Sequence, residues 1–206
     1  MRYSLVIAAV AVIFFAVQAV VPGFTEALLL RSSDAAARPW IFLTSMFLHG
    51  DFSHLAFNMV ALLVFGLILE SVVSKKHFLM IYFAGGIAAG ISAAFFYTAA
   101  LGASGAIFAL IGTLAVMRPR MTVWAFGVPM PMFAAAIFWM SADLIGLFAP
   151  TTVANAAHLA GLFFGIAFGL AIRKKYPAPK RSGRRQLISD YEIDEWEESY
   201  LKGEKK

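Results

Sequence analysis

Residues 101–106 read Leu101-Gly102-Ala103-Ser104-Gly105-Ala106 and open an apolar run that continues to Met117. The run has the composition of a membrane helix, and Arg118 follows it directly. Polar side chains are costly inside a membrane helix, so the Ser104 hydroxyl indicates a functional group. A serine among glycines is also a common helix-packing contact, and the segment differs from the Gly-x-Ser-x-Gly turn of soluble hydrolases. The segment therefore predicts a membrane helix and leaves two roles open for its serine.

The composition predicts a membrane protein. Of the 206 residues, 61% are hydrophobic and 14% are charged, whereas about a quarter are charged in a soluble domain. The net charge of +5 comes from basic residues at the ends of apolar blocks, which is the positive-inside pattern and not a nucleic-acid surface. The absence of cysteine excludes disulfides and thiolate metal sites. We expect contact with the lipid bilayer and none with nucleic acid.

Apolar blocks occur six times, at residues 5–21, 52–73, 78–100, 104–117, within 123–148, and at 153–172. Basic residues precede the first block and follow the second, fourth and sixth, so all of them fall on one side if every block spans the membrane. We predict an all-α polytopic membrane protein, a compact bundle of six transmembrane helices with both termini in the cytoplasm. A cleaved signal peptide is the alternative interpretation of the first block.

The composition changes near Tyr176. Residues 1–175 form the predicted membrane domain, and residues 176–206 form a polar cytoplasmic tail in which basic, Pro-rich sequence precedes an acidic stretch. The segment 22–50 is too polar to span the bilayer and too apolar to stay free, so we expect an interfacial loop. We expect the membrane to be the cytoplasmic membrane of a prokaryote, from the compact six-helix layout.

Four polar side chains share one depth in the predicted bundle. Ser104 and His158 lie roughly 21 and 22 Å from the basic residue that ends each helix, at about 1.5 Å per residue. Asn58 lies roughly 25 Å from its basic end, and His54 lies about one turn further out on the same helix face. These side chains come from three helices, so their common level indicates one site toward the outer side of the membrane.

Small residues recur every fourth position in the sixth block, at Ala157, Gly161, Gly165 and Gly169. Such a series lets two membrane helices approach backbone to backbone. We expect Gly105 to leave room for this helix, so that the adjacent histidine reaches the fourth helix.

The polar cluster has the groups needed for nucleophilic acyl transfer. A serine becomes a good nucleophile when a base takes its proton, and histidine suits that role near neutral pH. We therefore predict Ser104 as nucleophile and His158 as base. The tetrahedral intermediate requires donors for its oxyanion, and we assign His54, Asn58 and the backbone N–H of Ser104 to it.

No carboxylate is expected beside His158. Asp143 lies near the outer end of the fifth block and Glu70 near the cytoplasmic end of the second, so we interpret both as ties between helices. The prediction is a Ser104–His158 dyad and not a triad.

A metal site competes weakly with this interpretation. His49, His54 and His158 could be assembled as ligands, but the sequence has no His-Glu-x-x-His helix and no carboxylate at their depth. We predict no metal and no cofactor.

Three segments resemble the motifs of the rhomboid intramembrane serine proteases. His54-Leu55-Ala56-Phe57-Asn58 resembles the family's His-x-x-x-Asn on the second helix, and His49 matches a further histidine before it. Gly102-Ala103-Ser104-Gly105 resembles the Gly-x-Ser-Gly that opens the fourth helix. Ala157-His158-Leu159-Ala160-Gly161-Leu162-Phe163-Phe164-Gly165 resembles the Ala-His-x-x-Gly-x-x-x-Gly of the sixth. The order, spacing and helix assignment agree over residues 1–175.

The resemblance implies a rhomboid-like fold and an intramembrane serine endopeptidase that cleaves transmembrane segments of membrane proteins. It implies that Ser104 is the nucleophile, that His158 is the base, and that His54 and Asn58 lie in the oxyanion region. It also implies that Glu70 ties helices together near the cytoplasmic side.

Two positions depart from the family pattern. Phe108 stands where a tyrosine commonly supports the histidine ring, so only stacking would remain. The loop reads Arg38-Pro39-Trp40 and not the usual Trp-Arg order. We expect substrate access beside the fifth helix, with the link 148–153 as a cap.

Two other functions are compatible with the sequence. A catalytically silent rhomboid-like protein would bind membrane proteins and leave them intact. A small transporter or channel would use the polar cluster as a midplane site, although the sequence has no internal repeat of the kind many transporters contain. Labelling of Ser104 by a fluorophosphonate would distinguish the protease from the silent binder. Solute flux that survives Ser104→Ala would support the transporter or channel.

Overall fold

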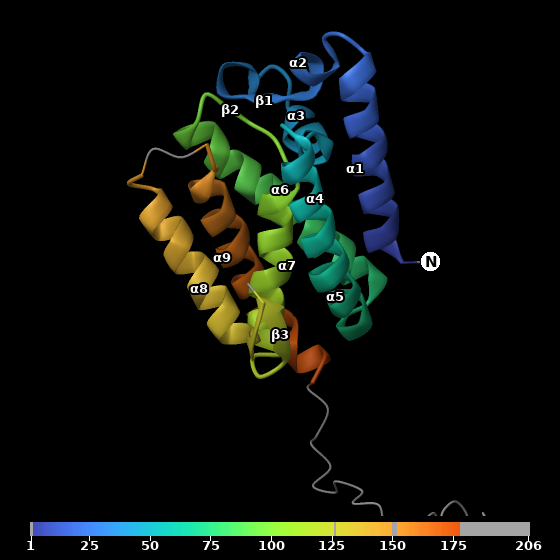
Figure 1. Ribbon diagram of the computed structural model, residues 1–206. Coiled ribbons are helices and arrows are strands. Elements are labelled where there is room, and N and C mark those ends of the chain that lie inside the picture. The colour runs from blue at the N-terminus through green and yellow to red at the C-terminus, as the bar shows by residue number, and fades with distance from the viewer. Residues whose placement is uncertain (1, 126, 150–151, 178–206) are drawn as a thin grey trace, which may run out of the picture.

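Six apolar helices form the body of the part of the chain that the computed structural model describes, residues 2–125, 127–149 and 152–177. They follow the six predicted blocks, and the helix Ser104–Met117 (α7) runs through the middle of the bundle (Figure 1). The helices are α1 (Tyr3–Val20), α4 (Phe52–Ala61) continued by a π-helical turn (Leu62–Gly66) and α5 (Leu67–Val72), α6 (Lys75–Phe96), α7 (Ser104–Met117), α8 (Met132–Gly146) and α9 (Asn155–Ile172), which a 3-10 turn (Arg173–Lys175) extends.

The central position of α7 follows from its composition. Ten of its fourteen residues are buried, and most of these are alanine, glycine, leucine or isoleucine. The helix is about 21 Å long, shorter than the roughly 30 Å hydrocarbon layer of a bilayer. A helix of this length begins below the membrane surface if its other end lies at the opposite surface.

Residues 21–51 fold over one end of the bundle. They contain α2 (Phe24–Leu28), β1 (Leu30–Arg31), a 3-10 turn (Ser32–Asp34), α3 (Ile41–Thr44) and a second 3-10 turn (Ser45–Phe47). β1 pairs antiparallel with β2 (Ala99–Ala100), which precedes α7 (Figure 1). The Arg38 guanidinium forms an ion pair with Asp34 at 3.3 Å and lies over the Trp40 ring at 5.9 Å. The Arg-Pro-Trp order is thus compatible with an anchored loop.

The predicted fifth helix occupies the second part of its block. Before it, β3 (Thr122–Ala125) and β4 (Val128–Pro131) form an antiparallel hairpin. Pro129 and Pro131 explain the boundary, because proline lacks an amide N–H and disfavours the α conformation of the residue before it. The helix therefore begins at Met132, directly after Pro131.

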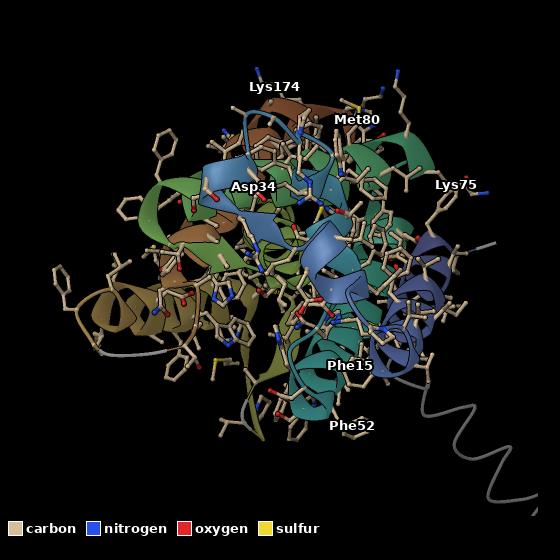
Figure 2. The ribbon with its side chains drawn as sticks, turned by 90° about the horizontal axis from the view of Figure 1, so that it is seen from above. Phe15, Asp34, Phe52, Lys75, Met80 and Lys174 are labelled. Carbon is tan, nitrogen blue, oxygen red and sulfur yellow. The ribbon has the colours of Figure 1, made fainter. Side chains whose placement is uncertain are left out.

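The helices have the apolar surface of a membrane protein. Within the described residues, four are long and apolar enough to cross a bilayer, namely Tyr3–Val20, Phe52–Val72, Lys75–Phe96 and Asn155–Lys175. α7 and α8 are apolar but have 14 and 15 residues, so six spans remain a prediction. Large side chains such as Phe57 and Phe95 are more than three-quarters exposed. In the view from above, Phe52 points away from the bundle (Figure 2).

The helix ends that adjoin basic residues lie at one end of the bundle. α1 begins there, and α5, α7 and α9 end there (Figure 1). The basic residues Lys75, Arg118 and Arg173 therefore share one end, as the predicted topology requires. At that end Glu70 accepts a hydrogen bond from the Ser4 backbone N–H at 2.9 Å, which confirms Glu70 as a tie between helices. The predicted tail lies outside the described residues from 178 onward.

Candidate active site

A tight turn delivers Ser104 to the first position of α7. Gly102 has φ +117, a backbone conformation that residues with a Cβ rarely adopt. Its N–H donates to the Ser45 carbonyl at 2.9 Å. A Cβ at Gly102 would lie 2.8 Å from the His54 ring. The first glycine of the motif thus lets the chain turn into α7 and lets the imidazole pack against that turn.

Glycines bring α9 onto α7. A Cβ at Gly161 would lie 2.1 Å from the Gly105 carbonyl oxygen, and one at Gly165 would lie 2.0 Å from the Ala109 carbonyl oxygen. Thr113 Oγ1 donates to the Gly165 carbonyl at 3.0 Å. The predicted backbone-to-backbone approach is confirmed, because no side chain larger than hydrogen fits between the two helices at these positions.

Gly105 has a different role from the predicted one. A Cβ at Gly105 would lie 2.3 Å from the Ala89 Cβ of α6 and 3.7 Å from the Ala157 carbonyl oxygen of α9. Its hydrogen therefore makes room for α6, and its carbonyl group is the part that faces α9. The sequence could not distinguish the two neighbours, because both α6 and α9 carry small residues.

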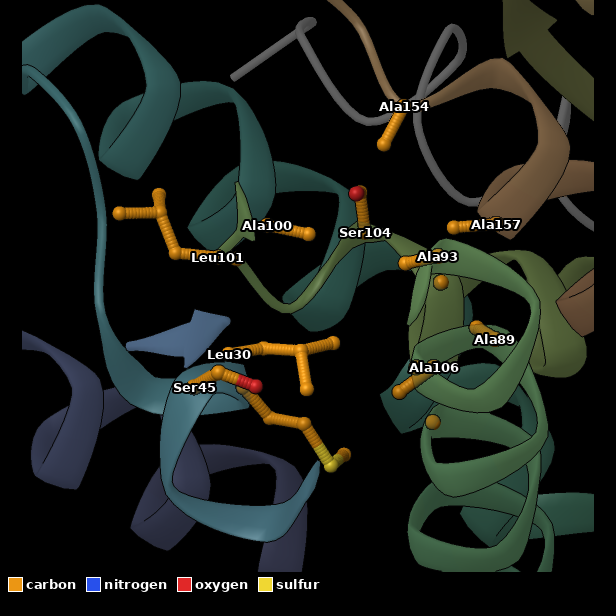
Figure 3. A pocket seen from close by; sticks show the side chains of 15 residues that line it. Leu30, Ser45, Ala89, Ala93, Ala100, Leu101, Ser104, Ala106, Ala154 and Ala157 are labelled. Atoms are coloured by element: carbon orange, nitrogen blue, oxygen red, sulfur yellow. The ribbon is translucent and has the colours of Figure 1, made fainter. Parts of the chain in front are cut away.

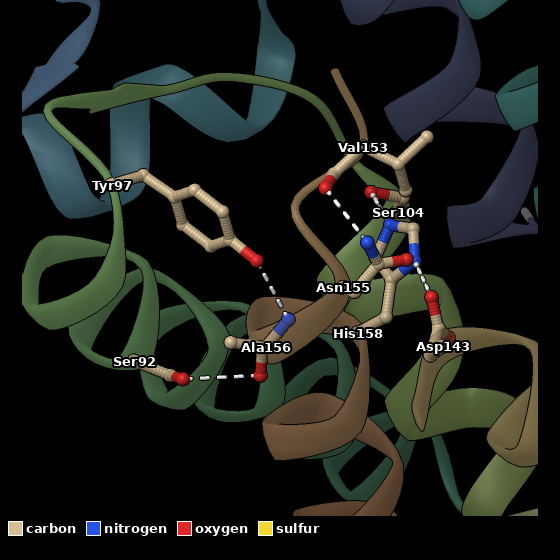
Figure 4. A network of polar contacts seen from close by, with 8 residues as sticks. All are labelled: Ser92, Tyr97, Ser104, Asp143, Val153, Asn155, Ala156 and His158. Atoms are coloured by element: carbon tan, nitrogen blue, oxygen red, sulfur yellow. Dashed lines mark hydrogen bonds and ion pairs between the residues drawn. The ribbon is translucent and has the colours of Figure 1, made fainter. Parts of the chain in front are cut away.

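The close approach places the His158 ring beside Ser104. The distance from His158 Nε2 to Ser104 Oγ is 2.7 Å (Figure 4). Phe108, one turn along α7, stacks on the imidazole with ring centroids 4.4 Å apart and an interplanar angle of 10°. The stacking expected for a phenylalanine at this position is therefore present.

The prediction that no carboxylate accompanies His158 is wrong. Asp143 Oδ1 of α8 lies 3.0 Å from His158 Nδ1 (Figure 4). Asp143 lies three residues before the end of α8, and His158 lies three residues after the start of α9. Two consecutive antiparallel helices bring such positions to the same depth, so the sequence could have placed this carboxylate at the level of His158, but not in contact with it.

Two residues near the end of α6 hold the first turn of α9. The Ala156 N–H donates to the Tyr97 hydroxyl oxygen at 3.0 Å, and Ser92 Oγ donates to the Ala156 carbonyl at 3.0 Å (Figure 4). The first N–H groups of a helix have no partner within it, so Tyr97 satisfies one of them. Both residues fix the turn that carries His158, and neither contact is predictable from the sequence pattern alone.

His54 and Asn58 project from α4 into the same cleft as the serine and histidine. Asp51 caps α4, because its Oδ1 accepts from the His54 N–H at 2.8 Å. That hydrogen bond is the main cause of a lowered pKa for the Asp51 carboxyl. Asn58 is 5% exposed, and its Nδ2 donates to the His54 carbonyl at 2.9 Å. Nδ2 carries a second hydrogen that this bond does not use.

The cleft is large, with a volume of about 1040 Å³. Ser104, His158, His54 and Asn58 all line it, together with apolar side chains of α4, α7 and α8. The four polar side chains that the sequence places at one depth therefore line one cleft. Thr152 and Val153, which follow α8, also line it.

A second cavity, of about 30 Å³, lies against the start of α7. Small side chains form most of its wall, and Ser104 is one of the lining residues (Figure 3). The volume suffices for one or two water-sized groups.

His49 does not join a metal cluster. Its ring lies 5.1 Å from the His54 ring, and the described residues contain no group of three or more His, Asp or Glu side chains placed to hold a metal ion. Burial, reinforced by the nearby His54, lowers the pKa of His49 to about 4. This histidine is therefore neutral near pH 7.

The fold and the site define a helical membrane protein with a serine–histidine pair inside its bundle. The sequence matches the Rhomboid domain family over residues 36–175. Rhomboid protein 1, mitochondrial, of Saccharomyces cerevisiae is 28% identical over 177 residues, which cover 80% of this chain and 50% of that protein. Rhomboid protease GluP of Bacillus subtilis is 34% identical over 153 residues, which cover 72% of this chain and 28% of that protein. Rhomboid protease GlpG of Yersinia pseudotuberculosis is 27% identical over 131 residues, which cover 62% of this chain and 46% of that protein.

The chain belongs to the rhomboid family, since the family match covers more than half of it. It spans half or less of the length of these three relatives. Family membership and the apolar helices together identify an integral membrane protein. The relatives include bacterial and mitochondrial proteins.

Proposed function

We propose that this protein is an intramembrane serine endopeptidase that cleaves transmembrane segments of membrane proteins. The observation that carries the proposal is the 2.7 Å contact between Ser104 Oγ and His158 Nε2, in a cleft that also holds His54 and Asn58. A nucleophile in hydrogen-bond contact with its base is the minimal machinery for acyl transfer. Family membership supports the same reaction class.

The reaction begins with proton transfer from Ser104 Oγ to His158 Nε2 while Oγ bonds to the scissile carbonyl carbon. The carbonyl π electrons move to oxygen and form the tetrahedral oxyanion. Collapse of this intermediate breaks the C–N bond, and Nε2 returns its proton to the leaving amine. Nε2 then takes a proton from a water molecule while the water oxygen attacks the acyl carbon. When this second tetrahedral intermediate collapses, the bond from the carbon to Ser104 Oγ breaks and Nε2 returns the proton to Oγ.

The oxyanion needs hydrogen-bond donors that point at the position of the carbonyl oxygen in the tetrahedral intermediate. We assign the free N–H of Asn58 Nδ2, the His54 ring and the Ser104 backbone N–H to this role. The Ser104 N–H belongs to the first residue of α7, where the helix dipole also favours negative charge.

The cleft offers a path for the substrate from the lipid. It lies between α4 with its π-helical turn and α8, lined by Phe57 and Val64 on one side and Trp139 on the other. An intact helix shields its peptide bonds, so the substrate must unwind locally before it reaches Ser104. Gly or Pro in the substrate lowers the cost of that unwinding.

The proposed topology places both termini in the cytoplasm and the site toward the outer side of the membrane. The basic residues Lys75, Arg118 and Arg173, which follow α5, α7 and α9, support this orientation. We propose the cytoplasmic membrane of a prokaryote as its location, and the link 148–153 as the cap of the cleft. Residues 150–151 of that cap lie outside the described part of the chain.

Cleavage of a single-span test substrate by wild type, Ser104→Ala and His158→Ala tests the function. We expect wild type to cut the substrate and to react with a fluorophosphonate probe. Both variants should lose at least about 10³-fold in kcat, and Ser104→Ala should not be labelled. Folded wild-type protein that neither cuts nor reacts with the probe would instead support a membrane-protein binder.

A further inference from the structure

Asp143 is a buried acidic residue that has no role in a Ser104–His158 dyad. It is 5% exposed and lies on α8, whereas the serine and histidine lie on α7 and α9. Its Oδ1 contacts His158 Nδ1 at 3.0 Å, and its Oδ2 is buried without a hydrogen-bond partner among the described residues. A buried carboxylate with one satisfied oxygen is costly, so its interaction with the histidine has to offset that cost.

The contact determines which ring nitrogen of the histidine carries the proton. An ionised carboxylate only accepts hydrogen bonds, so His158 Nδ1 must be the donor in this pair. Nε2 is then unprotonated and can accept from Ser104 Oγ, 2.7 Å away. With the proton on Nε2 the ring would donate to the hydroxyl and could not act as the base.

The contact also favours the transition state over the resting state. During attack on the substrate the imidazole gains a proton and becomes a cation. A fixed carboxylate beside Nδ1 stabilises that cation more than the neutral ring, and both side chains are largely shielded from solvent. The Nδ1 proton stays on the ring throughout and is not transferred to Asp143.

The structure holds the three partners of the ring in place. Phe108 covers one face of the imidazole, Ser104 contacts Nε2, and Asp143 contacts Nδ1. One turn after Asp143, a Cβ at Gly146 would lie 2.5 Å from Asn155 Oδ1, so α8 packs closely on the first turn of α9 (Figure 4). This packing fixes the distance between the carboxylate and the ring.

We propose that Asp143 is a positioning residue that orients His158, keeps its proton on Nδ1 and stabilises the imidazolium, so that the site works as a Ser104–His158–Asp143 triad. The inference rests on the proposed endopeptidase function. It differs from the dyad predicted from the sequence in requiring a third helix, α8, for full activity.

The test compares Asp143→Asn and Asp143→Ala with wild type on the same single-span substrate. We expect kcat to fall by about 10²- to 10⁴-fold in both variants, with KM within about twofold of wild type, because Asp143 does not line the cleft. Formate should restore part of the kcat of Asp143→Ala, since it can occupy the vacated site as a carboxylate. Leu144→Ala is the matched control, because Leu144 is the next residue of α8 and is 43% exposed; it should keep wild-type kcat.

Wild-type kcat in Asp143→Asn would overturn the proposal. A loss of activity that follows a lower thermal midpoint in both variants, with no response to formate, would also overturn it by assigning Asp143 a structural role. These outcomes are distinct from failure of the endopeptidase function, in which wild type neither cuts the substrate nor reacts with the fluorophosphonate.

Discussion

At the scale of the residue, the histidine of α9 gives the serine its role. A hydroxyl between two glycines is an ordinary packing group until a base lies beside it. In this structure His158 Nε2 lies 2.7 Å from Ser104 Oγ, and Phe108 and Asp143 restrict how the imidazole can turn. The side chains of Ser104 and His158 carry the groups proposed to react, and their neighbours hold those groups in contact.

The pH dependence of stability tests another single residue, His49. Burial lowers its pKa from 6.5 to about 4, so the unfolded chain binds a proton there at a higher pH than the folded chain does. Stability is therefore fully present above about pH 6.5 and falls as the pH drops from 6.5 towards 4, by on the order of 2 to 3 kcal/mol at pH 4.5. The expected result is a lower thermal midpoint in detergent at pH 4.5 than at pH 7.

His49→Gln supplies the comparison, because glutamine does not titrate in this range. Its midpoint should fall by less than that of wild type between pH 7 and pH 4.5, since the other titrating groups are shared. Equal decreases in both proteins would show that the folded structure does not suppress protonation of His49.

At the scale of the element, the pairing of α7 with α9 sets the distance between Ser104 and His158, the proposed nucleophile and base. Hydrogen atoms at Gly161 and Gly165 are the only side-chain volume between the two backbones at these points. The two backbones are in close contact there, so a methyl group added at either glycine must push the helices apart.

Gly161→Val should abolish cleavage, with a loss of at least about 10²-fold in kcat, because the added Cβ would overlap the Gly105 carbonyl oxygen. The measurement is substrate cleavage with a parallel thermal midpoint. Phe163→Val is the control on the same helix, since the Phe163 side chain is 53% exposed. Wild-type cleavage by Gly161→Val would contradict the role of the α7–α9 contact.

At the scale of the whole molecule, the two cavities around Ser104 differ in size and lining. The large cleft extends to Trp124 of the β3–β4 hairpin and is bordered by bulky apolar side chains. The small cavity is lined mainly by alanines and glycines, including Ala89, Ala93 and Ala106 (Figure 3). For the proposed endopeptidase, we expect the cleft to receive a transmembrane segment and the cavity to receive one small side chain next to the cleaved bond.

A substrate with Ala before the cleaved bond should be cut about 10- to 100-fold faster than the same substrate with Phe there. Forcing a phenyl ring into a cavity that is too small for it costs about 1–3 kcal/mol. The measurement is kcat/KM for both substrates. Ala93→Leu narrows the cavity and should lower cleavage of the Ala substrate. Equal rates for the Ala and Phe substrates would exclude the small cavity as the binding site for that side chain.

The sequence determined the helices and most of the candidate site. Long apolar blocks with basic ends gave the order of the helices, because burial of apolar surface and the cost of charge in lipid are local properties of each block. The rise per residue then grouped Ser104, His158, Asn58 and His54, and these four residues do line one cleft. Length and periodicity suffice for such inferences.

Contacts between helices were beyond that reasoning, because they depend on the direction in which each side chain points. The proximity of Asp143 to His158, the hydrogen bond from Ala156 to Tyr97, and the packing of Gly105 on α6 all follow from the rotation of one helix against another. Depth along a helix can be counted from the sequence, whereas rotation about its axis is set by the packing of all its neighbours. For that reason the sequence predicted a dyad, and the folded chain presents the same two residues with a carboxylate beside them.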